Sequence, residues 1–206
     1  GANIDDIGKT IGLDPRIGKL FLNAGPGYGG SCLPKDMKAL INFAKASGIN
    51  PTLLNAVEEV NTKQLEQIIL MIKQKLGNLA SKKITILGTA FKPNTDDIRD
   101  SIAIELIKKL LNKKAKIIIH DPKAMKNTQR IFKEKINYAK TIEDALAKSQ
   151  CVIIMTQWKQ YEKLNNNQFK YMTRKFVIDC RRMLAKKQLD VDYYAIGLGK
   201  QNWNIL

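Results

Sequence analysis

The stretch KKITILGTAFKPNTDDIRDSIAIELIKKLLNKKAKIIIH, residues 82–120, contains two short apolar runs with an amphipathic segment between them. The runs, residues 84–87 and 117–119, are rich in isoleucine, and apolar residues recur at helical spacing from 101 to 112. Short, continuously apolar strands that alternate with helices are typical of a parallel sheet covered on both faces. This stretch therefore predicts a strand, a helix and a second, parallel strand.

The same alternation continues towards the C-terminus. Helical segments are expected near residues 127–135, after Thr141, where Asp144 completes a capping box, and around Phe169. Two further apolar runs, residues 152–155 and 176–178, flank the last of these segments. We predict an α/β fold in which residues 81–206 form a Rossmann-like, doubly wound parallel-sheet domain. Ligands of such a sheet bind beyond the carboxyl ends of its strands. Those ends are expected near residues 88–92, 120–121, 156–157 and 179–181.

The N-terminal part of the chain shows helical patterns only. Short helical pieces are expected over residues 3–22, and a glycine-rich segment, residues 23–32, excludes a regular element. Pro34 suits the first turn of the helix that follows. We predict a helical central domain over residues 1–80, which carries the glycine-rich segment and ends in a long connecting helix.

That long helix is predicted to follow Asn50 as its cap and Pro51 at its first position, and to end at Gly77. Its apolar stripe consists of Val57, Val60, Ile68, Ile69, Ile72 and Leu76. Because one small domain cannot cover so long a stripe, we predict a homodimer that is formed largely through this helix.

Composition excludes several classes of protein. The 206 residues include 35 lysines and arginines against 19 acidic residues, which gives a formal net charge of +16, and 44% of them are hydrophobic, as in a globular chain. No apolar run approaches the roughly 20 residues of a membrane span. Residues 1–6 lack the basic and apolar regions of a signal peptide, so neither a membrane protein nor an exported one is expected.

The cysteines are few and scattered. Cys32, Cys151 and Cys180 are odd in number and far apart, and His120 is the only histidine. These counts argue against a disulfide scaffold and a structural zinc site, so we predict no metal. A reduced, cytoplasmic protein fits this cysteine usage best.

The excess of positive charge invites a nucleic-acid-binding interpretation. The lysines between residues 108 and 116, however, flank an amphipathic helix, which is typical of a solvated outer face. We expect the charge to attract a small anionic ligand.

The glycine-rich segment contains the residues best suited to chemistry. The glycines of residues 25–30 would let backbone amides approach an anionic or sugar ligand closely. Cys32 precedes a helix start, where the helix dipole and Lys35 favour a thiolate, and Asp36 could hold a water or a proton. An isolated cysteine is more often buried and inert, but the glycine loop, the helix start and the acid together favour a reactive one.

A second candidate is the turn after the first apolar run. No Gly-x-Gly-x-x-Gly fingerprint follows any of the apolar runs, and Gly88 leads into Phe91 and Lys92 instead. Lys92 could contact a phosphate as a point charge, with the helix start at Ser101 nearby for anion binding. The ordinary alternative is a solvated lysine in a loop.

Three motifs resemble those of one enzyme family. Residues 25–36, GPGYGGSCLPKD, closely resemble the catalytic cysteine loop of the UDP-glucose/GDP-mannose dehydrogenase family. Residues 91–101, FKPNTDDIRDS, resemble its second signature, and residues 179–181, DCR, its third. The first two motifs are long enough to be specific, and the three occur in the family's order across nearly the whole chain.

The resemblance implies a four-electron oxidation of a sugar nucleotide. NAD takes a hydride from the C6 alcohol of the sugar, the resulting aldehyde adds to the cysteine, and loss of a second hydride leaves a thioester that water hydrolyses. On the matching positions, Cys32 would be the nucleophile, and Asp36 would activate water or receive protons.

The resemblance also implies a set of ligand-binding residues. The implied sugar-nucleotide ligands are Asn23, Gly25, Gly27, Tyr28, Gly29, Phe91, Lys92 and Arg181, together with Arg16, which would reach the sugar of a neighbouring subunit. Arg99 would face NAD. For each arginine the ordinary alternative is a surface ion pair, which is nearly neutral in energy.

The sequence departs from the family pattern at its start. Family members begin with an NAD-binding Rossmann domain and a long helix that bears a catalytic lysine and asparagine, and this sequence starts after both. The resemblance is therefore to the C-terminal half, and we expect the isolated chain to bind NAD weakly and to be inactive.

Several alternatives for the function remain open. Ser31 before Cys32 resembles the branches that use UDP-glucose and GDP-mannose. UDP-glucose, oxidised to UDP-glucuronate, is the first choice of substrate, and GDP-mannose or another nucleotide sugar is the alternative. A non-catalytic sugar-nucleotide-binding or dimerisation module is the second hypothesis, and a nucleic-acid-binding protein is a distant third.

Overall fold

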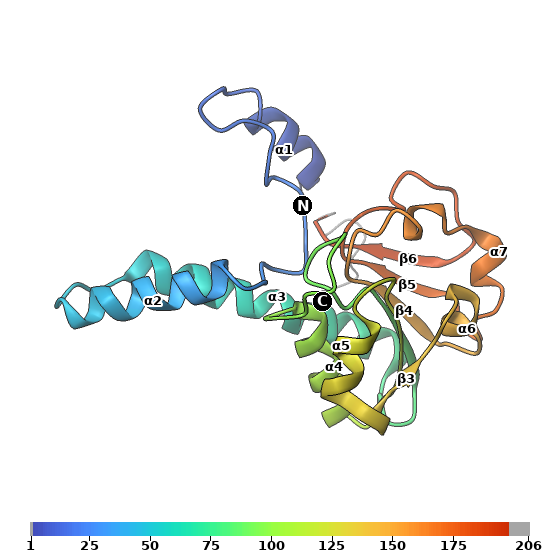
Figure 1. Ribbon diagram of the computed structural model, residues 1–206. Coiled ribbons are helices and arrows are strands. Elements are labelled where there is room, and N and C mark those ends of the chain that lie inside the picture. Colours follow the sequence, from blue (N-terminus) through green and yellow to red (C-terminus); the bar gives the residue numbers. More distant parts are fainter. Residues whose placement is uncertain (1, 198–206) are drawn as a thin grey trace.

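The isoleucine-rich runs form the centre of a six-stranded parallel sheet in the computed structural model, which describes residues 2–197 (Figure 1). The strand order is β3-β2-β1-β4-β5-β6. The strands are β1 (Lys83–Leu87), β2 (Lys116–His120), β3 (Asn137–Tyr138), β4 (Cys151–Ile154), β5 (Phe176–Asp179) and β6 (Asp192–Ala195). The prediction of an α/β, Rossmann-like fold is confirmed.

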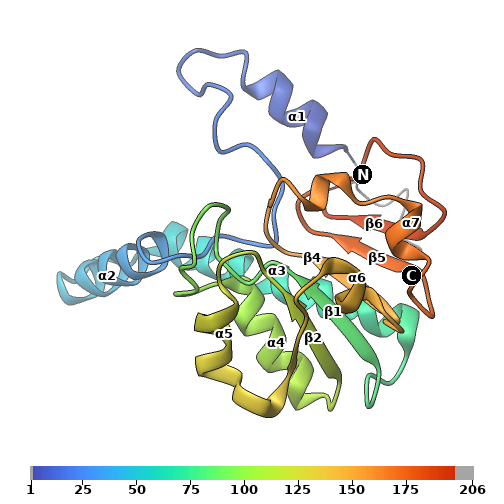
Figure 2. The same ribbon diagram turned by 45° about the vertical axis from the view of Figure 1, so that its right-hand side comes forward.

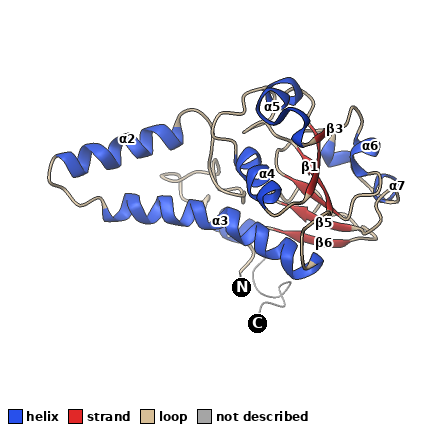
Figure 3. Ribbon diagram, turned by 90° about the horizontal axis from the view of Figure 1, so that it is seen from below, coloured by secondary structure: helices blue, strands red, loops and turns tan. Residues whose placement is uncertain are grey.

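Helices cover both faces of the sheet. The α-helices are α1 (Ile4–Ile11), α2 (Leu33–Ala46), α3 (Thr52–Leu76), α4 (Ile102–Asn112), α5 (Met125–Phe132), α6 (Ile142–Leu146) and α7 (Asn166–Phe169). Figure 3 shows α3 and α4 on one side of the strands and α6 and α7 on the other. Alternate strand residues divide between these sides, so that Ile84 and Ile86 pack with α3 and α4, and Leu87 with α6 and α7. Burial on both faces explains why these strands are continuously apolar.

The two edge strands were not predicted from the sequence. β3 has two residues, an asparagine and a tyrosine, and β6 has the sequence DYYA. Each lies at one end of the strand order and pairs with a single neighbour. Edge strands are short and polar because they are only partly covered, so their sequences lack the apolar run that marks the central strands.

α2 and α3 form an arm that extends away from the sheet (Figure 3). Pro34 lies in the first turn of α2, as predicted. The prediction of Pro51 at the first helical position is wrong by one residue, since Pro51 is the cap of α3, with a non-helical ψ of 57°. The prediction of a long helix that ends at Gly77 is confirmed.

The apolar stripe of α3 is divided between two environments. Ile68, Ile69, Ile72 and Leu76 are buried in the chain's own core beside the sheet. The expectation that one chain cannot cover this stripe is therefore wrong for its second half. Val60, in the first half, remains 58% exposed.

Within residues 2–197, no helix is both long and apolar enough to cross a membrane, and no cluster of three or more metal-ligating side chains is present.

The only histidine is a buried part of the fold. His120 is 7% exposed, and its Nδ1 lies 2.9 Å from the hydroxyl oxygen of Tyr161. The Tyr161 hydroxyl in turn donates to the His120 carbonyl at 2.8 Å. Burial lowers the pKa of His120 below its ordinary value of 6.5. The folded chain therefore holds this imidazole in its neutral form.

Acidification is expected to destabilise the chain through His120. Below pH 6.5 the unfolded chain takes up a proton at this residue and the folded chain resists it, so the free energy of unfolding falls with pH. One group contributes at most about 1.4 kcal/mol per pH unit. Urea unfolding between pH 7.5 and 5.5 measures the slope. Asp179, whose pKa burial raises, acts with the opposite sign, so the comparison with His120→Asn isolates the histidine. Equal slopes in the two proteins would contradict the assignment.

Candidate active site

The glycine-rich loop is held between α3 and the turn that follows β1. Gly27 has a φ of +117°, and a Cβ there would lie 2.6 Å from Oδ1 of Asn61 on α3. On the other side, a Cβ on Gly29 would overlap the carbonyl oxygen of Asp100, and one on Gly30 would overlap the ring of Phe91. Glycine is required here because both sides of the loop are occupied and because left-handed φ values strain other residues.

A groove of about 890 Å³ opens along this loop. All the predicted sugar-nucleotide ligands except Arg16 line it, and they come from three separate segments of the chain: residues 23–29, residues 91–92 and residue 181. The groove lies where the loops after β1, β4 and β5 meet, which is the expected position for a ligand of a parallel sheet. Its volume is within the range typical of small-molecule sites.

Lys92 and Phe91 form one wall of the groove. The Lys92 ammonium is exposed and lies 5.3 Å from the centre of the Phe91 ring. The expectation of an open helix start at Ser101 is wrong, because Ser101 is only 2% exposed and its hydroxyl donates to the Thr89 carbonyl at 2.7 Å. The glycine loop also covers this turn, since the Gly30 amide donates to the Asp100 carbonyl at 3.3 Å.

Arg181 is fixed by the turn that follows β5. Its Nε donates to the Met155 carbonyl at 2.8 Å, and its amide donates to the Asp179 carboxylate at 3.0 Å. Nη1 lies against Gly25, where a Cβ would come within 2.7 Å. Burial lowers the pKa of this guanidinium. A partly desolvated, oriented guanidinium of this kind suits an anionic or polar ligand.

Cys32 is the N-cap residue of α2 and is exposed, with its Sγ 3.7 Å from the Ser31 hydroxyl. Asp36 follows one turn later, and its amide donates to the Cys32 carbonyl at 3.0 Å. The Lys35 ammonium, which was expected to favour the thiolate, instead pairs with the Asp36 carboxylate at 2.6 Å. Cys32 and Asp36 do not line the groove, but Leu33, next to Cys32, does.

The two remaining arginines point elsewhere. Arg99 pairs with Asp97 at 2.7 Å, and its side chain is 72% exposed. Arg16 pairs with Asp14 at 2.7 Å, its side chain is 87% exposed, and it does not line the groove. Both arginines thus lie on the surface of the chain, each paired with the aspartate two residues before it.

Three further lining residues lie outside the set of ligands that the resemblance implies. Asn61 and Gln64 of α3 face the groove, as does Gln157 after β4. Gln157 belongs to a strand end that the sequence marked as a ligand position. In the sequence, Asn61 is visible only as a polar residue next to Val60 of the apolar stripe. Helical periodicity does not show which segment its side chain contacts.

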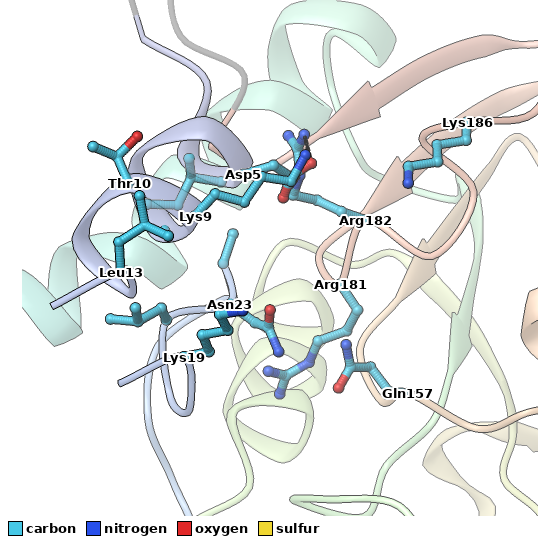
Figure 4. A pocket seen from close by; sticks show the side chains of 14 residues that line it. Asp5, Lys9, Thr10, Leu13, Lys19, Asn23, Gln157, Arg181, Arg182 and Lys186 are labelled. Atoms are coloured by element: carbon cyan, nitrogen blue, oxygen red, sulfur yellow. Dashed lines mark hydrogen bonds and ion pairs between the residues drawn. The ribbon is translucent and has the colours of Figure 1, made fainter. Parts of the chain in front are cut away.

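A second cavity, of about 660 Å³, adjoins the groove beneath α1. The two share Asn23, Gln157 and Arg181, whose side chains lie together in Figure 4. Figures 1 and 2 both place α1 outside the layers that cover the sheet. It is held there by Arg182, which pairs with Asp5 at 2.6 Å. The N-terminal segment therefore forms a wall at this end of the groove.

Two models of one protein family match the chain. The central-domain model of the UDP-glucose/GDP-mannose dehydrogenase family matches residues 1–63. The UDP binding domain model of the same family matches residues 85–186. Together they cover the glycine loop and most of the sheet, without the edge strand β6.

Individual relatives agree with these matches. The UDP-glucose 6-dehydrogenase AglM of Haloferax volcanii is 40% identical over 196 residues, which are 95% of this chain and 45% of that protein. The UDP-glucose 6-dehydrogenase of Rickettsia felis is 37% identical over 203 residues, 96% of this chain and 45% of that protein. The structure of a UDP-glucose dehydrogenase from Pyrobaculum islandicum superimposes with a TM-score of 0.87 at 33% identity and covers 96% of this chain and 44% of that one.

The chain thus spans about half the length of the curated relatives it matches. The central-domain match precedes the UDP-binding-domain match along the chain, and the solved structure superimposes on nearly the whole chain. The chain belongs to the UDP-glucose/GDP-mannose dehydrogenase family.

Proposed function

We propose that the chain is the sugar-nucleotide-binding and cysteine-bearing portion of an NAD-dependent UDP-glucose 6-dehydrogenase. Residues 1–80 would be its central domain and residues 81–206 its UDP-sugar-binding domain. The observation that carries the proposal is the groove, which gathers the glycine loop, Lys92 and Arg181 around one volume. Two cations and a glycine-rich backbone complement a diphosphate. The name of the Haloferax relative supports UDP-glucose as the substrate.

The proposed reaction oxidises the C6 alcohol of UDP-glucose to the carboxylate of UDP-glucuronate. Loss of a hydride and a proton gives the C6 aldehyde, and the Cys32 thiolate adds to its carbon to form a thiohemiacetal. Loss of a second hydride, together with the hydroxyl proton, gives a thioester. Water then cleaves the C–S bond, which releases the carboxylate and restores the thiol. When bound, NAD supplies the hydride acceptor for each of the two oxidations.

The residues of this chain would have separate roles in the reaction. Cys32 is exposed at the start of α2, next to the groove residue Leu33. Asp36, in the first turn of α2, would take the proton of the attacking water. Lys92 and Arg181 would hold the nucleotide, and the glycine loop would present its amides to the ligand.

The fit to NAD is partial. Arg99, which pairs with Asp97, would meet the cofactor. No strand among residues 2–197 leads into a Gly-x-Gly-x-x-Gly turn. A single arginine does not replace the glycine-rich turn and helix start that bind a dinucleotide. We therefore propose that the chain alone binds NAD weakly and forms no NADH from UDP-glucose.

UDP is expected to bind the chain. Lys92→Ala and Arg181→Ala should each weaken that binding about tenfold or more, because each substitution removes a charge-assisted contact. Calorimetric titration of UDP into the three proteins measures the change. Lys126→Ala, which removes an exposed lysine of α5, is the matched control and should bind as the wild type does.

Arg181 is also part of the fold, so its variant needs a structural check. Thermal unfolding should accompany each titration, and Arg181→Lys retains the charge without the hydrogen bond from Nε to Met155. Equal UDP affinities in the wild type, Lys92→Ala and Arg181→Ala would refute the assignment of the groove.

A further inference from the structure

One side chain of α3 bonds both main-chain groups of a residue in the glycine loop. Oδ1 of Asn61 accepts a hydrogen bond from the Tyr28 amide at 2.7 Å, and its Nδ2 donates to the Tyr28 carbonyl at 3.1 Å. This paired arrangement is the one that a neighbouring main chain would provide. Within residues 2–197, Asn61 is the sole hydrogen-bond partner of both main-chain groups of Tyr28.

The Tyr28 side chain is attached to the same helix. Its hydroxyl donates to the Glu58 carboxylate, which lies one turn before Asn61 on α3. Burial and this carboxylate raise the pKa of Tyr28 to about 12, so the phenol remains a donor at neutral pH. Gly27 packs directly on the Asn61 amide. The helix therefore holds the loop at the backbone of Tyr28 and at the tip of its side chain.

We propose that Asn61 is a positioning residue of the groove, which acts through the Tyr28 peptide to fix the wall that the glycine loop presents to the nucleotide sugar. Gly27, Tyr28 and Gly29 all line the groove, and Cys32 begins α2 four residues further on. The role in ligand binding rests on the proposed function of the groove, whereas the role in fixing the loop does not.

The alternative is that Asn61 is an ordinary residue of a helix surface. Asparagine is a poor helix former in the middle of a helix, where its amide competes with the backbone. Here the amide leaves its own helix and bonds a segment 33 residues away. A glycine-rich loop loses more chain entropy on ordering than other segments do. The bonds from Asn61 offset part of that cost, because they satisfy groups that no regular element serves.

The experiment compares Asn61→Ala and Asn61→Asp with Asn55→Ala. Asn55 is an exposed asparagine on the same helix, without a side-chain hydrogen bond among the described residues, so it controls for loss of an amide from α3. The aspartate keeps the size and the acceptor of Asn61 but places an oxygen opposite the Tyr28 carbonyl. Three quantities are measured: the UDP affinity, the amide hydrogen exchange of residues 27–30 without ligand, and the alkylation rate of Cys32.

Both Asn61 variants are expected to bind UDP about tenfold more weakly and to exchange the amides of residues 27–30 faster. The alkylation rate of Cys32 should change in the same variants. Asn55→Ala should match the wild type in all three measurements. If Asn61→Ala proves too unstable to study, Asn61→Asp decides the question.

Unchanged exchange over residues 27–30 in a folded Asn61 variant would overturn the proposal, as would wild-type UDP affinity. If the wild-type chain fails to bind UDP, the proposed function of the groove is wrong. The exchange rates then still decide whether Asn61 fixes the loop.

Discussion

Cys32→Ser is expected to lower NADH formation from UDP-glucose by roughly 10³-fold or more in a chain joined to the family's NAD-binding domain. A thiolate adds to an aldehyde and later leaves from a thioester. A serine hydroxyl, with a much higher pKa, adds poorly and forms an ester that hydrolyses more slowly. Substrate binding should persist because the groove residues are unchanged. Intact mass measurement should reveal any ester that accumulates.

The other two cysteines provide the control for this experiment. Cys151 and Cys180 are completely buried, and burial raises the pKa of each thiol, so both are inert in the folded chain. Cys151→Ala should therefore turn over at the wild-type rate, and an alkylating reagent should label Cys32 alone.

Asp36→Asn supplies the companion variant. It leaves the thiol in place and removes only the acid-base role, so turnover should fall by about 10² to 10⁴. Without the added domain, the wild-type chain should form no NADH. Near-normal turnover by Cys32→Ser would mean that the covalent route is wrong and that Cys32 is an ordinary exposed cysteine.

The central strands could be predicted because the feature that marks them, a short apolar run, is visible within a few consecutive residues. Residues 84–87, 117–119, 152–155 and 176–178 are apolar on both faces except for Thr85, which is buried, and this pattern is typical of strands inside a covered parallel sheet. The edge strand β6 was missed because a strand with one neighbour and partial cover has no such requirement. Local patterns identify central strands and pass over peripheral ones.

The sequence predicted which residues belong to the site, but not which contacts they make. The motifs assigned the glycine loop, Lys92 and Arg181, and the groove contains all of them. They did not reveal that the Lys35 ammonium pairs with Asp36 or that Ser101 is covered by the glycine loop. These contacts depend on which segments meet in three dimensions, and spacing along one segment carries no information about that.

We propose that the exposed face of the arm binds a second copy of the chain. Leu40 and Phe43 of α2 are 51% and 70% exposed, Ile49 in the turn after α2 is 63% exposed, and Val60 of α3 is 58% exposed. The second half of α3 is already covered by the sheet, so the interface would involve α2 and the first half of α3. Arg16, exposed and outside the groove, would reach the partner's groove in such a dimer.

Phe43→Asp is expected to prevent the proposed dimer from forming. The Phe43 side chain is largely exposed in the single chain, so the substitution should cost the fold little. In a dimer the new carboxylate would be buried without a partner, a cost of several kcal/mol that weakens association by more than about 10²-fold. Sedimentation at tens of micromolar, a generous range for an obligate dimer, should show a dimer for the wild type and a monomer for the variant. Ile131→Asp, at a position of α5 that is 47% exposed, is the matched control and should remain dimeric. A wild-type chain that sediments strictly as a monomer would refute the dimer, and a dimeric Phe43→Asp would move the interface away from the arm.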